Sequence, residues 1–312
     1  MPYPSGVFKA KAREALMNHW QTALLIALIV NLPTLLAQGI AVFTGNDIAR
    51  RSEDLLIALM RDGQLDNAHI LDGLNALMNE TGIWLMIGLR AVAWIITPVL
   101  SLGMTHWLLL RLRKKEAGVD TVFSRLPVFL KSIGLHLLTA LKTLLWMLPG
   151  AAVSMLSVIP LLGARGGDNE AVYSALTTGS MLIYAGMGIM LVLGVMAALR
   201  YALAEYKLAD EPETGVLACI RESKRVMAGK KGALLSLEIS FIFWYLGEYM
   251  VSSLLTGFGG GVLSLMFQML AGMALSVYIT CSVGSFYLLT QTPDTGAAET
   301  DESGASGEDI GL

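Results

Sequence analysis

Long apolar runs follow one another along almost the whole chain, and short polar or charged segments separate them. A helix needs about 20 residues, at ~1.5 Å each, to cross a hydrocarbon core of ~30 Å. Six runs are long enough, and they cover about 22–43, 83–110, 133–162, 178–200, 233–255 and 262–290. The pattern predicts an all-α, polytopic membrane helical bundle, with an integral membrane domain over residues 1–290.

Breaks in the apolar pattern predict where these helices bend and turn. Pro98, Pro149 and Pro160 lie inside apolar runs, where proline removes a backbone hydrogen bond and kinks a helix. The last two runs are joined by Gly257, Phe258 and three further glycines at 259–261. Such a short, glycine-rich connection predicts a tight hairpin.

A basic amphipathic segment precedes each pair of predicted spans. These segments cover residues 8–20, 122–135 and 216–234. In the first, Phe8, Ala12, Ala15, Leu16 and Trp20 share one helical face, which is the pattern of a helix lying in the membrane interface. The recurrence predicts a three-fold internal repeat, each unit being an amphipathic interfacial helix followed by a helical hairpin.

Basic residues are distributed unequally between the two sides of the predicted bundle. Of the 22 Lys and Arg residues, sixteen fall in the N-terminal segment and the even-numbered loops, and four fall in the other loops. Cytoplasmic loops are enriched in Lys and Arg, so this asymmetry predicts that both termini are cytoplasmic. The first run is too long for a signal-peptide core and is expected to be retained.

Composition agrees with the apolar pattern and limits what lies outside the membrane. The chain is 54% hydrophobic and 15% charged, with a mean hydropathy of +0.61. No polar stretch is long enough for an independent enzymatic core. Residues 44–82 predict an external helical segment, and residues 291–312, rich in Gly, Ser, Thr, Asp and Glu, predict a disordered acidic cytoplasmic tail.

Known catalytic and cofactor motifs are not found in the sequence. No Walker pattern, HExxH, GxSxG or dinucleotide fingerprint occurs, and Cys219 and Cys281 form no CxxC or Cys/His cluster. The formal net charge is −3, so the chain lacks the overall positive charge that is typical of nucleic-acid-binding proteins. We therefore expect no enzyme, no catalytic residues, no cofactor, no metal site and no nucleic-acid partner.

Ionisable residues inside the predicted spans are the first candidate site, because charge in hydrocarbon is costly and is often functional. They are Arg90, His106, His136, Lys142, Glu238 and Glu248. Arg90 and Glu248 both fall about 10 Å from the outer face, and Lys142 and Glu238 both fall roughly 8 to 14 Å from the inner face. Each pair could hold an anionic headgroup, a peptide or a coupling proton, or could neutralise itself or reach the interface.

A cytoplasmic basic cluster is the second candidate site. It comprises Arg221, Lys224, Arg225, Lys230 and Lys231. Basic residues beside a membrane attract anionic lipid by about 1 kcal/mol each. The alternative is the ordinary enrichment of cytoplasmic loops in basic residues. Gly229 is predicted to cap the amphipathic helix before the next span.

The third unit resembles a known bacterial integral membrane family. The residues that carry the resemblance are Tyr201-Ala-Leu-Ala-Glu-Tyr206, Leu208-Ala-Asp-Glu-Pro212, Ser223 to Lys231, Leu237 to Phe241, and Trp244. Together with Ala12 to Leu16 and Trp20, they are similar in order and spacing to the family called domain of unknown function 975. The resemblance implies a multi-pass protein of the bacterial inner membrane and implies no established activity.

These observations favour a non-enzymatic accessory, scaffold or lipid- or peptide-handling factor. Its expected partners are the lipid bilayer, anionic lipids or another membrane protein. A small-solute or peptide transporter is the alternative, and it would require the intramembrane charges to line a cavity. A membrane-embedded enzyme acting on lipids is a further alternative, and it would require Glu238, His106 and His136 to converge.

Overall fold

A computed structural model describes residues 5–40, 81–164 and 169–291. Within these ranges every secondary-structure element is helical, as the apolar pattern predicts. Six helices are long and apolar enough to cross a membrane, at Trp20–Ile40, Trp84–Leu112, Val119–Pro160, Glu170–Asp210, Lys231–Phe258 and Val262–Gln291. The predicted fold class of a multi-pass helical bundle is confirmed. The predicted external segment, apart from its last residues, and the predicted acidic tail lie outside the described residues.

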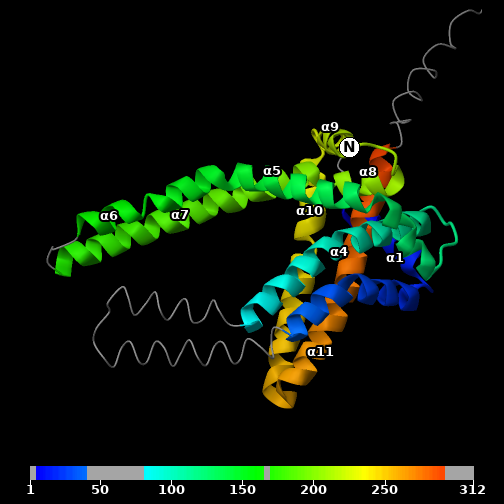
Figure 1. The fold of residues 1–312 in the computed structure, drawn as a ribbon, viewed down its shortest axis with the longest axis horizontal. Helices are drawn as coiled ribbons and strands as arrows, with labels where there is room; N and C mark the ends of the chain where they lie inside the picture. The colour runs from blue at the N-terminus through cyan, green and yellow to red at the C-terminus, as the bar shows by residue number, and fades with distance from the viewer. Residues whose placement is uncertain (1–4, 41–80, 165–168, 292–312) are drawn as a thin grey trace, which may run out of the picture.

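Figure 1 shows how the described helices are arranged. In chain order they are α1 (Ser5–Leu16), a span over Trp20–Ile40, α4 (Thr81–Leu112), the 3₁₀ segment η1 (Val119–Val128), α5 (Phe129–Met155), α6 (Val158–Gly163), α7 (Asn169–Tyr201), α8 (Ala204–Asp210), α9 (Val216–Val226), α10 (Lys231–Ile239) and α11 (Ile242–Gln291). The short helices α1, α8 and α9 gather at one end of the bundle.

The element α11 is a hairpin with two antiparallel arms, as the glycine-rich connection predicts. The Ser252 and Ser264 side-chain oxygens are 2.7 Å apart, and the Ser264 hydroxyl also donates to the Ser252 carbonyl at 2.9 Å. Twelve residues of one straight helix would separate these groups by about 18 Å. The chain therefore reverses direction between them, and Figure 1 shows the two arms side by side.

The helices α5 and α7 pack against each other along most of their lengths. Gly150 and Gly186 let the two backbones meet, because a Cβ atom on Gly186 would lie 2.6 Å from the Gly150 carbonyl oxygen. The α6 end of this hairpin stands clear of the other described helices (Figure 1). Side chains at the α6 end of the hairpin, such as Met155 and Ile159, are exposed in the isolated protein, as expected for a surface that faces lipid.

Some predicted boundaries differ from the observed ones. The third predicted span at 133–162 begins earlier, at Phe129, and is interrupted between α5 and α6 just before Pro160. Proline is tolerated in the first turn of a helix, so the chain starts a new helix there instead of kinking one helix. The fourth span at 178–200 begins earlier still, at Asn169, because a polar start extends the helix beyond the apolar run.

The three basic amphipathic segments adopt different structures. In α1, the apolar face of Phe8, Ala12 and Leu16 is buried against protein, mainly α11, and not against lipid. The second segment is a 3₁₀ helix that leads into α5, and the third is split into α9 and α10. The C-cap of α9 is Met227, and Gly229, with φ +75°, lies two residues later in the turn that leads into α10. The three-fold repeat stays a prediction.

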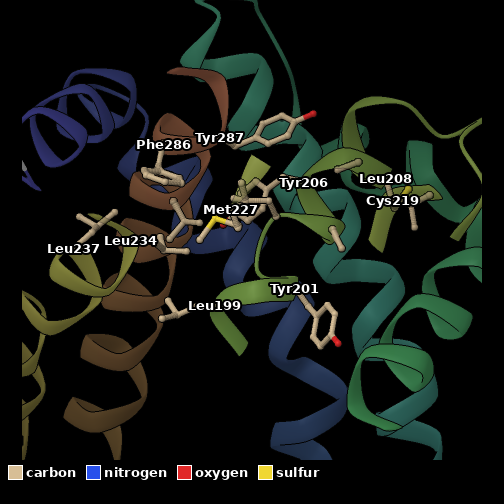
Figure 2. Packing of buried hydrophobic residues seen from close by; sticks show 14 of the residues in the cluster. Leu199, Tyr201, Tyr206, Leu208, Cys219, Met227, Leu234, Leu237, Phe286 and Tyr287 are labelled. Carbon is tan, nitrogen blue, oxygen red and sulfur yellow. The ribbon is translucent and has the colours of Figure 1, made fainter. Parts of the chain in front are cut away.

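Two groups of buried apolar residues hold the bundle together. One surrounds α8, and Figure 2 shows its residues Tyr206 and Tyr287, whose ring centroids are 5.9 Å apart. The other joins α1, the span Trp20–Ile40, α4 and the second arm of α11, with Trp107 fully buried. At this end of the bundle, α8 contacts α4, α5, α9 and α11.

Candidate functional site

The seven-residue helix α8 carries two carboxylates at the junction of several helices. Its residues Ala204, Tyr206, Leu208 and Ala209 are buried in the core, which fixes the orientation of the helix. The Tyr206 hydroxyl donates to the Thr280 carbonyl at 2.9 Å and ties α8 to α11. The carboxylate at position 205 lies on another face of α8.

Glu205 accepts hydrogen bonds from two hydroxyl groups of α4. Ser101 donates at 2.8 Å and Thr105 at 3.2 Å, both to Oε1. The other oxygen, Oε2, lies 4.0 Å from Nε2 of His136 on α5. A carboxylate inside a membrane protein is stabilised by such donors, because the surrounding hydrocarbon offers none. These four residues form the Glu205 cluster.

His136 is oriented by a second set of hydrogen bonds. Its Nδ1 lies 3.3 Å from the Ser132 carbonyl, and the Ser132 hydroxyl donates to the Pro98 carbonyl at 2.8 Å. A carbonyl oxygen can only accept, so Nδ1 carries the proton in this contact. Nε2 then faces Glu205. The arrangement links α4 to α5 through polar groups within the membrane span.

The Glu205 cluster does not have the geometry of a catalytic triad. In a triad the serine donates to histidine and histidine donates to the carboxylate. Here the Ser101 hydroxyl donates to the Glu205 carboxylate itself. Among the described residues, no group of three or more His, Cys, Asp and Glu is placed to hold a metal ion.

A cavity of about 780 Å³ opens beside this cluster, between the span Trp20–Ile40, α4 and α5. We call it the α4 cavity. Its polar lining residues are Thr34, Gln38, Arg90, Thr97, Ser101 and His136, and its apolar ones include Ala37, Ala93, Trp94 and Pro98. The Thr34 and Thr97 hydroxyl groups in its wall are hydrogen-bonded to each other at 3.3 Å. Its volume lies within the range of small-molecule binding sites.

A second cavity lies on the other side of His136. This α5–α7 cavity has a volume of about 530 Å³ and is lined by His136, Thr139, Thr143, Tyr201 and Glu205, among others. His136 therefore borders both cavities, while Ser101 borders the first and Glu205 the second. The Glu205 cluster therefore lies between the two cavities.

The structure does not bring together the two pairs of charged residues that lie at similar depths in the predicted spans. Arg90 lines the α4 cavity, whereas Glu248 lines a different cavity between the arms of α11 and Trp20. No ion pair or hydrogen bond joins Arg90 to Glu248, or Lys142 to Glu238, in the part of the chain that the structure describes. Two residues at the same depth can point in different directions around their helices. Depth alone therefore could not predict whether these residues pair.

The two intramembrane histidines also lie in different surroundings. His106 contacts Arg125, whose Nη2 is 3.0 Å from Nδ1 of the imidazole, while His136 belongs to the Glu205 cluster. Glu238 is half-buried and makes no side-chain hydrogen bond to either histidine. The three residues that a membrane-embedded lipid enzyme would need to bring together do not form one site.

The second carboxylate of α8 lies in a separate hydrogen-bonded network. Asp210 accepts two hydrogen bonds from Arg113, at 2.6 and 2.7 Å, and one from the Tyr287 hydroxyl at 3.3 Å. These contacts favour the charged guanidinium and raise the pKa of Arg113 above its usual value. Lys131 donates to the Pro212 carbonyl at 2.7 Å and secures the following loop.

The predicted basic cluster is only partly paired within the protein. Arg225 forms an ion pair with Glu222 at 2.6 Å, and the Lys224 ammonium lies 5.7 Å from the centre of the Tyr201 ring. The side chains of Arg221, Lys230 and Lys231 make no ion pair within the described ranges. These three remain available to lipid headgroups. Cys219 lies buried in the same helix, and burial raises the pKa of its thiol.

Residues of the Glu205 cluster other than His136 are not predicted by the apolar pattern. Glu205 and Asp210 follow the fourth predicted span, which ends at residue 200, so the pattern assigns them to a cytoplasmic loop. Ser101 and Thr105 carry no charge and leave no signal in an apolar run. The one available signal is position: Glu205 and Asp210 stand within the stretch that carries the family resemblance.

Comparison with known proteins adds one match. A family model described as "Protein of unknown function (DUF975)" matches residues 1–292. No curated protein matches the chain, and no solved structure matches it. The matched range includes every residue of the Glu205 cluster and of both cavities.

Proposed function

Because the chain belongs to the DUF975 family of proteins of unknown function, we propose its role from geometry: it is a non-enzymatic membrane protein that binds an anionic lipid. The proposed site is the α4 cavity. The observation that carries the proposal is Arg90, a charged residue inside a membrane span that lines a cavity of about 780 Å³ and has no acidic partner in the described structure.

The chemistry of the α4 cavity matches an amphipathic anion. A guanidinium in hydrocarbon is costly unless an anion or water compensates it, and arginine binds phosphate and carboxylate through several donors at once. Thr34, Thr97 and Ser101 supply hydroxyl groups, while Ala93 and Trp94 supply apolar wall for an acyl chain. A neutral lipid would leave Arg90 without a counter-ion.

The cytoplasmic basic cluster supports the same proposal at the other membrane face. Arg221, Lys230 and Lys231 have no ion-pair partner within the described ranges, and each contributes about 1 kcal/mol of attraction to an anionic surface. We propose that the protein lies in the bacterial inner membrane with both termini in the cytoplasm. The distribution of basic residues, sixteen against four, supports this orientation.

Lipid binding can be measured on the purified protein with matched variants. In nanodiscs that contain phosphatidylglycerol, native mass spectrometry should detect bound anionic lipid, and Arg90→Gln should weaken binding by about tenfold because one charge-assisted contact is lost. Lys142→Gln is the control, since Lys142 is also an intramembrane cation but does not line the α4 cavity. Equal lipid binding by wild type and Arg90→Gln would contradict the proposal.

A transporter of small solutes or peptides is the second candidate. The observation that favours it is His136, which borders both the α4 cavity and the α5–α7 cavity and lies 4.0 Å from Glu205. A titratable pair between two cavities is the arrangement expected for a coupling site. Solute flux into vesicles reconstituted with the wild-type protein, lost in His136→Gln, would favour transport over static lipid binding.

A further inference from the structure

The two arms of α11 enclose a third cavity, which shares no lining residue with the α4 cavity. This α11 cavity has a volume of about 780 Å³ and is closed at one side by Trp20 and Arg13. Five aromatic side chains line it: Trp20, Phe243, Trp244, Phe267 and Tyr278. Apart from Arg13 and one acidic side chain, the remaining lining residues are small or aliphatic.

That acidic side chain is Glu248, on the first arm of α11. It is half-buried within a membrane span, and its Oε1 would lie 3.4 Å from a Cβ atom on Gly272 of the opposite arm. No hydrogen bond or ion pair joins Glu248 to another described residue, and Arg13 of the same cavity does not reach it. An ionised carboxylate within a membrane span is stabilised when a positive partner offsets its desolvation.

We propose that the α11 cavity binds a lipophilic organic cation, such as a quaternary ammonium or phosphonium ion with apolar substituents. The carboxylate of Glu248 supplies the opposite charge, and the aromatic walls attract a cation through their π faces. An uncharged acyl chain would fill the apolar walls but leave Glu248 unpaired. The site is separate from the proposed anionic-lipid site, so either can fail without the other.

Charge complementarity also distinguishes the two ionisable residues of the cavity. Arg13 lies on the exposed side of α1, where water can solvate the guanidinium. Glu248 lies further along the span, beside Gly247 and Val251 of the same arm. The deeper residue has less access to water, so its charge governs which ion is favoured in the cavity.

Tetraphenylphosphonium and tetraphenylborate form a matched pair of probes, because they have nearly the same shape and opposite charge. Equilibrium dialysis against the full-length protein in phosphatidylcholine nanodiscs, corrected with empty nanodiscs, should show saturable binding of the cation. Glu248→Gln should weaken that binding by about tenfold or more. Glu238→Gln is the matched control, because Glu238 is another intramembrane carboxyl that does not line this cavity, and it should bind as the wild type does.

A second variant removes an aromatic wall without removing charge. Trp244 is 61% exposed in the isolated protein, so Trp244→Leu should fold and should weaken cation binding severalfold. The proposal is overturned if Glu248→Gln binds the cation as tightly as wild type. It is also overturned if tetraphenylborate binds as well as the cation and Arg13→Gln abolishes that binding, since the cavity would then be an anion site.

Discussion

Asp210 shows how one side chain can hold several elements together at the α8 end of the bundle. It accepts two hydrogen bonds from Arg113, which follows α4, and one from Tyr287 of α11. Its side chain is only 16% exposed, so these bonds are partly shielded from water. Charge-assisted bonds in such surroundings contribute more than those at a fully exposed surface.

Replacement of Asp210 by Asn should therefore destabilise the protein. The amide presents an NH₂ group to one of the two guanidinium nitrogens, so one bond is replaced by a contact between donors. The free energy of unfolding in mixed micelles of SDS and dodecylmaltoside should fall by about 1 to 2 kcal/mol. Glu211→Gln is the control, because its ion pair with Lys207 is an exposed i,i+4 pair, of a kind that contributes about 0.3 to 0.5 kcal/mol. Equal effects of the two variants would refute this role for Asp210.

At the scale of single residues, the sequence predicted which charged positions lie in the membrane spans. It did not predict which residues surround them in space. Arg90, His136 and Glu248 do line cavities, as a functional role would require. Their partners depend on the rotation of each helix about its axis, and the apolar pattern is too uniform to specify that rotation. A helix that is apolar on all sides has no single face that must turn toward the protein interior.

Among the elements, the α5–α7 hairpin depends on close backbone contact. A Cβ atom on Gly186 would lie 2.6 Å from the Gly150 carbonyl oxygen and 2.6 Å from the Ser154 amide nitrogen. Both are backbone atoms, so neither can move without shifting a helix. Small residues at such crossings permit the tight packing that stabilises helix pairs in lipid.

The substitution Gly186→Ala should separate the two helices and lower the free energy of unfolding by about 1 to 3 kcal/mol. Gly188 provides a matched control on α7, because a Cβ atom there would meet no other atom within 4 Å. Gly188→Ala should leave stability unchanged or slightly raise it, since alanine favours the helix. The two variants can be compared by SDS titration, and a smaller loss for Gly186→Ala than for Gly188→Ala would contradict the packing argument.

Element positions were predictable because the bilayer sets the length of a spanning helix. The predicted spans at 22–43, 83–110 and 262–290 lie close to the observed Trp20–Ile40, Trp84–Leu112 and Val262–Gln291. Helix ends were harder to predict where polar residues continue the helix past the apolar run, as at Asn169 of α7. The helix α8 was not predicted as an intramembrane element because its charged residues resemble those of a loop.

For the whole molecule, the distribution of basic residues predicts one orientation in the membrane. Reporter fusions after Gly118 and Glu213 should be active in the cytoplasm, and fusions after Leu65 and Asn169 should be active outside it. Alkaline phosphatase and green fluorescent protein report opposite sides, so each position can be measured twice. The reverse pattern at all four positions would invert the orientation that we propose.

The free end of the α5–α7 hairpin has a practical consequence for experimental structure determination. A membrane protein chain of only 33.5 kDa gives particles that are difficult to align by electron cryomicroscopy. The end of α6 and the start of α7 lie together at the far end of a long helical pair, and no residue of either end lines the α4 or α11 cavity (Figure 1). A rigid soluble domain inserted there would serve as a fiducial marker while leaving both cavities intact for ligand studies.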